Sequence, residues 1–191
     1  MRIVSGILKG QKIDFLKSPT TRPLKDFVKE NIFNIIKHSN LINVSLKNTN
    51  VLDLYSGVGS FGIECMSRGA NKVTFVENNN KALEILKKNI KKLKIGKKSK
   101  VYETKIISFL GQSNEREKYE IIFFDPPFSE SFFVEELKII KSSNIYKKKH
   151  IIVVHRENKS KDNLSENMNI IMTKNYGRSK IIFGNFNSNI S

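Results

Sequence analysis

The sequence predicts an α/β fold with a mostly parallel β-sheet, and three observations support this prediction. Short apolar runs of the kind found in buried strands alternate with segments whose apolar residues keep helical spacing. The links between these segments are short, as in repeated strand–helix–strand units. Near the C-terminus two strand-like runs flank the turn Tyr176-Gly177-Arg178-Ser179, which indicates a hairpin and therefore one antiparallel strand.

The first forty residues differ in pattern from the rest of the chain. The run Arg2–Ile13 contains glycines among alternating apolar and basic side chains, which is typical of a small hairpin. Prolines predict a loop at Ser18–Pro23, and apolar residues then recur on one helical face from Asp26 to about Lys37. We therefore expect residues 1–40 to form an N-terminal extension that packs on one domain, residues 41–191.

Strands and helices are expected to alternate through most of this domain. The expected strands are Val51–Tyr55, Lys72–Glu77, Lys100–Glu103, Glu120–Asp125 and His150–Val154. The helices between them are expected at about residues 60–68, 80–93, 106–110 and 132–141. The polar stretch Arg156–Glu166 predicts an exposed loop, and the closing hairpin is expected from Asn169–Thr173 and Lys180–Phe183.

Charge is the most unusual bulk property of this chain of 191 residues, which has a formal net charge of +16. Such an excess favours a polyanionic partner, chiefly nucleic acid. Of the 34 basic residues 28 are Lys, however, and an A/T-rich coding bias would give the same mixture. No apolar stretch approaches the roughly 20 residues that span a bilayer. With no signal-peptide pattern either, we expect a cytoplasmic protein, without membrane association and monomeric.

Metal, disulfide and thiol chemistry are not expected. Cys65 is the only cysteine and falls among apolar residues of an expected helix, which favours a buried core position over a nucleophile. His38, His150 and His155 are scattered and have no cysteine or carboxylate partners at ligand spacing. We therefore interpret all three histidines as structural.

A glycine loop predicts a nucleotide-type ligand. Gly57-Val58-Gly59-Ser60-Phe61-Gly62 follows an expected strand and opens an expected helix, and Glu77 lies 20 residues beyond Gly57, where a carboxylate can hold a ribose. Both NAD and S-adenosylmethionine carry such a ribose. Asp53, four residues before the loop, would repel a pyrophosphate and attract the ammonium group of a methionine. We therefore favour S-adenosylmethionine.

The motif Asp125-Pro126-Pro127-Phe128 indicates recognition of a flat amine. It follows the apolar run Ile121–Phe124, and its prolines stop that strand and restrict the backbone around Asp125. The Asp125 carboxylate and the Pro126 carbonyl would then be rigid acceptors for the two hydrogens of an exocyclic amine, while Phe128 stacks on the base. These four residues are the expected catalytic set.

With these motifs in place, the chain resembles a known family. Asp53–Gly59 resembles the first motif of class I methyltransferases, Glu77 their second, and Asp125–Phe128 the fourth motif of the amino-directed enzymes. The N-terminal segment is the more specific part, and it resembles the RsmD family at Arg2-Ile3-Val4-Ser5-Gly6, Lys9-Gly10, Arg22-Pro23, Asp26, Val28-Lys29-Glu30 and Ile32-Phe33-Asn34. The likeness spans nearly the whole chain and ends with Tyr176-Gly177 and the last strand.

The resemblance implies a Rossmann-like, seven-stranded sheet with helices on both faces, in which residues 41–191 form the methyltransferase domain. It implies transfer of a methyl group from S-adenosylmethionine to N2 of a guanine in 16S small-subunit ribosomal RNA, leaving S-adenosylhomocysteine and using no metal. The expected cofactor-binding residues are Asp53, Tyr55, Gly57, Gly59, Glu77 and Asn78. Leu24 and Phe27 depart from the usual family pattern, and Lys105 lies near where many class I methyltransferases present a carboxylate to the adenine.

The RNA partner, free 16S ribosomal RNA or the small ribosomal subunit, is expected to contact basic residues near the N-terminus. The candidate phosphate contacts are Arg2, Lys9, Lys12, Arg22 and Lys25. Two alternatives stay open at this point. The motif Asp125–Phe128 serves equally well for adenine N6 in DNA or RNA, and a methyltransferase fold can also act as a non-catalytic RNA-binding or ribosome-assembly factor.

Overall fold

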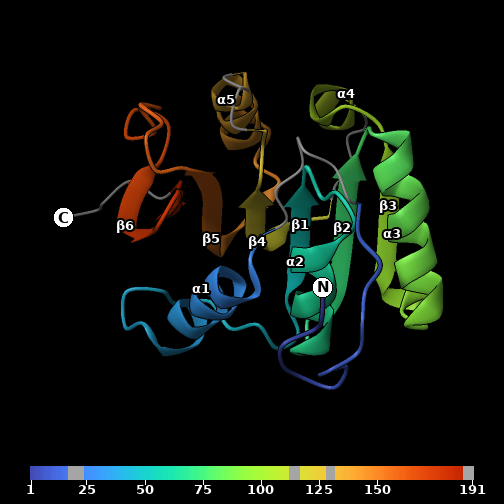
Figure 1. The fold of residues 1–191 in the computed structure, drawn as a ribbon. Coiled ribbons are helices and arrows are strands. Elements are labelled where there is room, and N and C mark those ends of the chain that lie inside the picture. Colours follow the sequence, from blue (N-terminus) through green and yellow to red (C-terminus); the bar gives the residue numbers. More distant parts are fainter. Residues whose placement is uncertain (17–23, 112–116, 128–131, 187–191) are drawn as a thin grey trace.

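The computed structural model of the chain describes residues 1–16, 24–111, 117–127 and 132–186. Its centre is a seven-stranded sheet in the order β3-β2-β1-β4-β5-β7-β6 (Figure 1). Strands β1 to β5 are parallel to one another, and β7 is antiparallel to both β5 and β6. The predicted mostly parallel sheet with one antiparallel strand is confirmed.

The helices and strands alternate as the hydrophobic pattern predicts. The strands are β1 (Asn50–Leu54), β2 (Lys72–Glu77), β3 (Ser99–Glu103), β4 (Tyr119–Phe124), β5 (Tyr146–Glu157), β6 (Asn169–Tyr176) and β7 (Ser179–Asn185). The helices are α1 (Asp26–His38), α2 (Ser60–Ser67), α3 (Asn80–Lys92), the short 3₁₀ helix η1 (Gly96–Lys98), α4 (Ile106–Gly111) and α5 (Phe133–Ser143). Most bounds lie within one or two residues of the expected ones.

Helices cover both faces of the sheet and bury two apolar clusters. Residues of α1, α2 and α3 pack with one set of strand side chains, which includes Ile121 and Phe123 of β4. Residues of α4 and α5 pack with the alternate set, which includes Ile122 and Phe124. Successive strand residues point to opposite faces, so a strand buried on both sides must be apolar throughout. This explains why β4 is a continuous apolar run without alternation.

Strand β5 is longer than the sequence predicts, and this corrects one interpretation. It continues through His155, Arg156 and Glu157, although the polar stretch from Arg156 onward predicts an exposed loop. Arg156 pairs with Lys180 and Glu157 with Ser179 of the antiparallel β7, and Arg156 is only 2% exposed. The polar side chains of this stretch indicated a loop. The strand that supplies hydrogen-bond partners for its backbone lies more than twenty residues later, so the local sequence does not reveal it.

The N-terminal segment forms the small hairpin that the glycines predict. Its arms are joined by an antiparallel bridge between Arg2 and Lys12, and the N–H of Ile3 donates to Gln11 at 3.0 Å. Ile3 and Ile13 are buried in the cluster on the α1 side of the sheet, together with Leu24 before α1. Within the described parts of the chain, no helix is both long and apolar enough to cross a membrane.

Candidate active site at the carboxyl ends of the central strands

The glycine loop joins β1 to α2 and shows why glycine is needed there. Gly59 caps α2 with φ of +86°, a left-handed conformation that side chains with a Cβ rarely adopt. Gly62 lies in the first turn of α2, where an added Cβ would come within 2.4 Å of Phe75 and 2.9 Å of the Asp53 carboxylate. The left-handed conformation of Gly59 shapes the turn, and the missing side chain of Gly62 lets α2 pack close to the sheet.

Asp53 of β1 forms a hydrogen bond with the glycine segment at the start of α2. It is 1% exposed, and its Oδ2 accepts the backbone N–H of Gly62 at 2.9 Å. Burial raises the pKa of the Asp53 carboxyl well above its usual value, and the negative charges of Asp125 and Glu77 raise it further, against the opposing effect of the Gly62 hydrogen bond. The carboxyl ends of β1, β2 and β4 therefore bring three acidic side chains close enough to influence one another.

Glu77 ends β2 and connects two loops. Its Oε2 accepts the N–H of Gly57 at 2.7 Å, while its Oε1 accepts those of Asn78 and Asn79 at 2.9 and 2.8 Å. Hydrogen bonds from backbone N–H groups to a carboxylate are charge-assisted and comparatively strong. Glu77 thus orders the glycine loop and the start of α3 before any ligand binds.

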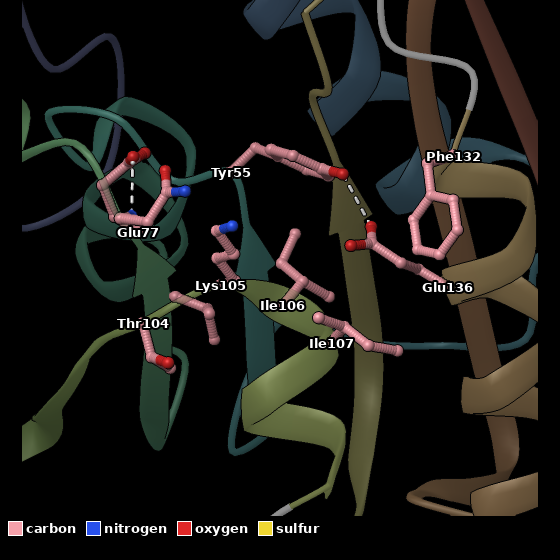
Figure 2. A pocket seen from close by; sticks show the side chains of 10 residues that line it. Tyr55, Glu77, Thr104, Lys105, Ile106, Ile107, Phe132 and Glu136 are labelled. Atoms are coloured by element: carbon pink, nitrogen blue, oxygen red, sulfur yellow. Dashed lines mark hydrogen bonds between the residues drawn. The ribbon is translucent and has the colours of Figure 1, made fainter.

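A cavity of about 310 Å³ opens beside these loops (Figure 2). It is lined by Tyr55, Val76, Glu77, Asn78, Thr104, Lys105, Ile106, Ile107, Phe132 and Glu136. Tyr55 reaches across it and donates its hydroxyl to Glu136 of α5 at 2.6 Å, while its backbone has a positive φ of 56°. The cavity therefore unites three expected cofactor-binding residues, Tyr55, Glu77 and Asn78, whereas Asp53, Gly57 and Gly59 lie outside its lining.

The expected acceptor motif lies at the end of β4, next to β1. The N–H of Asp125 approaches the carbonyl of Leu54 at 3.4 Å, so this residue directly adjoins the start of the glycine loop. The side chain of Asp125 is 26% exposed, Pro126 is buried and Pro127 is exposed. Phe128, the expected stacking surface, lies outside the described residues.

Two side chains of β5 brace this motif, and sequence reasoning missed both. The ring of His155 contacts Asp125, with 2.7 Å between Nδ1 and Oδ1. Arg156 donates to the carbonyl of Pro127 at 2.9 Å and also binds Asp162 at 2.8 Å. One signal was available: polar residues directly after the apolar run of an adjacent parallel strand lie at the same edge of the sheet.

The site suits a cationic ligand more than an anionic one. Asp53, Glu77 and Asp125 lie at the ends of three neighbouring strands, in a chain whose formal net charge is +16. The charges of Glu77 and Asp125 attract a sulfonium or an ammonium group and repel a pyrophosphate. These carboxylates therefore fit S-adenosylmethionine better than NAD.

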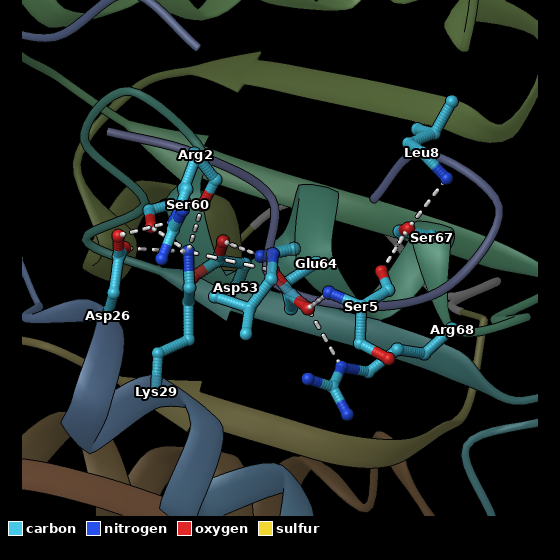
Figure 3. Close-up of polar contacts among 12 residues, drawn as sticks. Arg2, Ser5, Leu8, Asp26, Lys29, Asp53, Ser60, Glu64, Ser67 and Arg68 are labelled. Carbon is cyan, nitrogen blue, oxygen red and sulfur yellow. Dashed lines mark hydrogen bonds and ion pairs between the residues drawn. The ribbon is translucent and has the colours of Figure 1, made fainter. Parts of the chain in front are cut away.

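The candidate RNA contacts belong to the N-terminal hairpin and the start of α1, and Figure 3 shows this hairpin with Arg2 near Ser60 and Leu8 near Ser67. The carbonyl of Arg2 accepts from Lys29, whose ammonium lies 3.4 Å from Ser60, the first residue of α2. Farther along, Leu8 donates to Ser67, the last residue of α2, so the hairpin runs along this helix. Arg2, Lys12 and Lys25 therefore lie toward the glycine-loop end and Lys9 toward the opposite end. Arg22 lies outside the described residues.

An aromatic pair lies near these cations. Phe27 is 65% exposed and meets Tyr176 edge to face, with 5.9 Å between ring centroids and an interplanar angle of 84°. Tyr176 pairs with Ser179, which itself contacts His155 at 2.9 Å. Phe27 is therefore an exposed aromatic ring of α1 that packs against the hairpin between β6 and β7.

Among the described residues, no cluster of three or more histidine, cysteine or carboxylate side chains is arranged to hold a metal ion. Cys65 is buried, and burial raises the pKa of its thiol well above the usual value, so the side chain is an unreactive core group. Neither observation adds a reacting group to the site.

Comparison with known proteins identifies the family. A family model described as conserved hypothetical protein 95 matches residues 1–185. Ribosomal RNA small subunit methyltransferase D of Haemophilus influenzae is 30% identical over 178 residues, covering 93% of this chain and 89% of that protein. The chain belongs to the RsmD family. A putative rRNA methyltransferase of Bacillus subtilis is also similar, at 33% identity over 158 residues, which cover 82% of this chain and 83% of that one.

Solved structures agree with this RsmD-family assignment. A putative methyltransferase from Escherichia coli matches with a TM-score of 0.81 and 26% identity over 98% of both chains. A putative methylase from Haemophilus influenzae matches with a TM-score of 0.76 and 28% identity, covering 97% of this chain and 98% of that one. The fold prediction, including the class I methyltransferase topology, is confirmed.

Proposed function

We propose that this RsmD-family chain is an enzyme that transfers a methyl group from S-adenosylmethionine to the exocyclic N2 of a guanine in 16S ribosomal RNA. The observation that carries the proposal is the position of Asp125 and Pro126. They end β4 beside the glycine loop, with the carboxylate accessible but braced by a neighbouring strand. The name of the Haemophilus influenzae relative, ribosomal RNA small subunit methyltransferase D, supports RNA of the small subunit as the substrate class.

In this proposal the methyl donor binds at the carboxyl ends of β1 and β2. Glu77 and Asn78 line the cavity and would hold the ribose, and Tyr55 forms part of its wall. Gly57 and Gly59 allow a ligand close to the backbone, and Asp53 orders the loop through its hydrogen bond with Gly62. When bound, S-adenosylmethionine supplies a methyl group that is activated by its attachment to a sulfonium.

The chain's own contribution to catalysis comes from two acceptors. Guanine N2 is a poor nucleophile because its lone pair is delocalised into the ring. Hydrogen bonds from this amine to the Asp125 carboxylate and the Pro126 carbonyl draw the nitrogen toward tetrahedral geometry and localise the lone pair. They also strengthen as positive charge develops on the nitrogen, so they stabilise the transition state more than the ground state. After transfer, Asp125 or water accepts the amine proton.

The decisive experiment uses methyl-labelled S-adenosylmethionine with 16S ribosomal RNA and small subunits that lack the modification, followed by nucleoside analysis. We expect labelled N2-methylguanosine. Label in N6-methyladenosine would show instead that the same two acceptors hold the N6 amine of an adenine. RNA binding without any label, in protein that still binds S-adenosylhomocysteine, would favour the non-catalytic role.

We expect Glu77→Ala to weaken binding of S-adenosylhomocysteine at least about tenfold. The substitution removes the ribose acceptor and leaves three backbone N–H groups without their carboxylate. A hydrogen bond to a charged group contributes about 1.5–3 kcal/mol, and about 1.4 kcal/mol corresponds to a tenfold change in affinity. Isothermal titration calorimetry measures the dissociation constant.

Glu103→Ala is the matched control for this measurement. Glu103 lies beside Glu77 at the end of β3 and pairs with Lys87 on the surface. We expect its replacement to leave the dissociation constant within about twofold, since a surface ion pair contributes about 0–1 kcal/mol to stability. Equal affinity of the Glu77 variant and the native protein would remove Glu77 from the cofactor site.

RNA binding is expected to weaken steeply with salt, because each phosphate contact releases counterions. The logarithm of the association constant should fall by about 0.7–0.9 per contact for each decade of salt. Replacing Arg2, Lys12 and Lys25 together by alanine should reduce this slope by about 2. Fluorescence anisotropy of labelled RNA across a salt series measures the slope.

Three lysines near the amino ends of the strands supply the control. Lys97 and Lys98 precede β3 and Lys149 lies near the start of β5, and all three are exposed. Their triple replacement changes the net charge equally, and we expect it to leave the slope nearly unaltered. The same reduction in both triple variants would show that overall charge, rather than a defined track, governs binding.

A further inference from the structure

His155 lies at the point where β5 passes the acceptor motif. Its side chain is 4% exposed, and its ring lies between two partners. Nδ1 is 2.7 Å from Oδ1 of Asp125, and Nε2 is 2.9 Å from the hydroxyl of Ser179. The three residues come from the ends of β4, β5 and β7, and they continue one face of the sheet beyond its apolar column.

The chemistry of Asp125 and Ser179 indicates which ring nitrogen of His155 carries the proton. An ionised carboxylate only accepts hydrogen bonds, so Nδ1 must carry the hydrogen that Asp125 receives. In a neutral imidazole Nε2 is then an acceptor, and the Ser179 hydroxyl donates to it. With a neutral ring, the donors run in one direction, from Ser179 through His155 to Asp125.

This contact restricts Asp125 without covering it. One carboxylate oxygen is held by the ring, while the side chain stays 26% exposed. On the opposite side of the motif, Arg156 holds the carbonyl of Pro127, so consecutive residues of β5 brace the segment from both faces. An isolated surface carboxylate would rotate freely about its χ angles, whereas this one has its orientation set before substrate arrives.

We propose that His155 is a positioning residue, which orients the Asp125 carboxylate toward the amine that is to be methylated. The inference rests on the proposed methyl transfer, and it adds a role that the glycine loop and the acceptor motif do not supply. Loss of the ring would leave all binding groups in place but misdirect the acceptor. A displacement of about 1 Å at a reacting group can cost on the order of 10²-fold in rate.

Another histidine of the same strand is a matched control. His150 is 4% exposed, accepts the N–H of Phe186 at Nε2 and contacts the Lys147 carbonyl at Nδ1. Both ring nitrogens are therefore engaged, as in His155, but with backbone groups near the start of β5. A role that consists only of filling and satisfying the core would apply equally to both histidines.

The experiment compares His155→Phe, His155→Asn and His150→Asn in single-turnover and steady-state methylation of unmodified 16S ribosomal RNA. Phenylalanine fills the space without a donor, and we expect kcat to fall 10- to 100-fold with the KM for RNA and the Kd for S-adenosylhomocysteine within about twofold. Asparagine returns an N–H near the position of Nδ1, and we expect it to recover most of kcat. His150→Asn should lower the melting temperature but not kcat.

Two outcomes of these measurements would overturn the proposal: native kcat in His155→Phe, or equal loss of kcat in His155→Phe and His150→Asn. If His155→Phe fails to fold, Ser179→Ala provides the test, because it frees Nε2 while the ring remains, and a severalfold fall in kcat is expected. Unchanged kcat in that variant would also overturn the proposal.

A readout independent of activity separates this inference from the proposed function. Nitrogen-15 spectra of histidine-labelled protein distinguish the two neutral tautomers, and the His155→Asn spectrum assigns the signal. We expect a proton on Nδ1 of His155, and a proton on Nε2 alone would contradict the assigned contact. Native protein that shows this tautomer but methylates no RNA would refute the proposed function while leaving the contact with Asp125 in place.

Discussion

Replacing Asp125 by alanine is expected to abolish methyl transfer while leaving cofactor binding within a few-fold. The carboxylate supplies the interaction that strengthens as charge develops on the amine, and the Pro126 carbonyl alone cannot replace it. Removal of one comparable transition-state hydrogen bond in other enzymes costs about 10²–10³-fold in kcat. Single-turnover methylation measures the loss, and calorimetry with S-adenosylhomocysteine measures cofactor binding.

Asp125→Asn makes this test more informative. The amide keeps the size and one acceptor oxygen but removes the charge, so we expect an intermediate rate. Glu103→Ala, which removes a carboxylate from the same edge of the sheet, should have the native rate. Methylation by Asp125→Ala at the native rate would refute the mechanism, whatever the cofactor affinity.

Replacing Glu64 by alanine is expected to be strongly destabilising. Glu64 is fully buried in α2, and its carboxylate accepts the N–H groups of Val4 and Ser5 at 2.8 and 2.9 Å. It also pairs with Arg68 at 2.9 Å and lies 3.6 Å from the buried ammonium of Lys29 (Figure 3). Its removal takes a carboxylate from the buried ammonium of Lys29 and leaves two backbone donors unsatisfied, and breaking such a buried pair costs about 3–5 kcal/mol.

Urea denaturation measures this loss as a lower free energy of unfolding, and thermal unfolding as a fall in melting temperature on the order of 10 °C. The pair Glu135–Lys138 on the surface of α5 is the control. Both of its side chains are about half exposed, and we expect Glu135→Ala to change stability by less than about 1 kcal/mol. Equal effects of the two substitutions would show that the N-terminal segment is not held by Glu64.

Much of the fold could be predicted because its signals are local. The apolar runs of β1 and β4, the helical spacing in α3 and the turn between β6 and β7 each lie within a short window of sequence. The polar end of β5 could not be predicted in this way. Arg156 looks like a loop residue in its window, and its pairing with Lys180, its ion pair with Asp162 and its hydrogen bond to Pro127 make a buried strand position favourable.

The parts of the candidate site that could be predicted from the sequence are short motifs at the ends of strands. The glycine loop, Glu77 and Asp125 all follow strands, and parallel strands bring their carboxyl ends to one edge. The side chains that brace the site carry no such signal. His155 had the same structural interpretation as His150, and nothing in its neighbours along the chain separates the two.

The sequence by itself determined the α/β class, the positions of the motifs and the excess of positive charge, since each depends on residue type and spacing along the chain. The tertiary structure decided which groups meet. Strand order placed β5 between β4 and β7, and the pairing register then set His155 against Asp125 and Ser179. Packing of the hairpin along α2 set Glu64 against Val4, sixty positions away. A hydrogen bond forms only when geometry brings a donor to an acceptor, and that geometry follows from the packing of the whole chain.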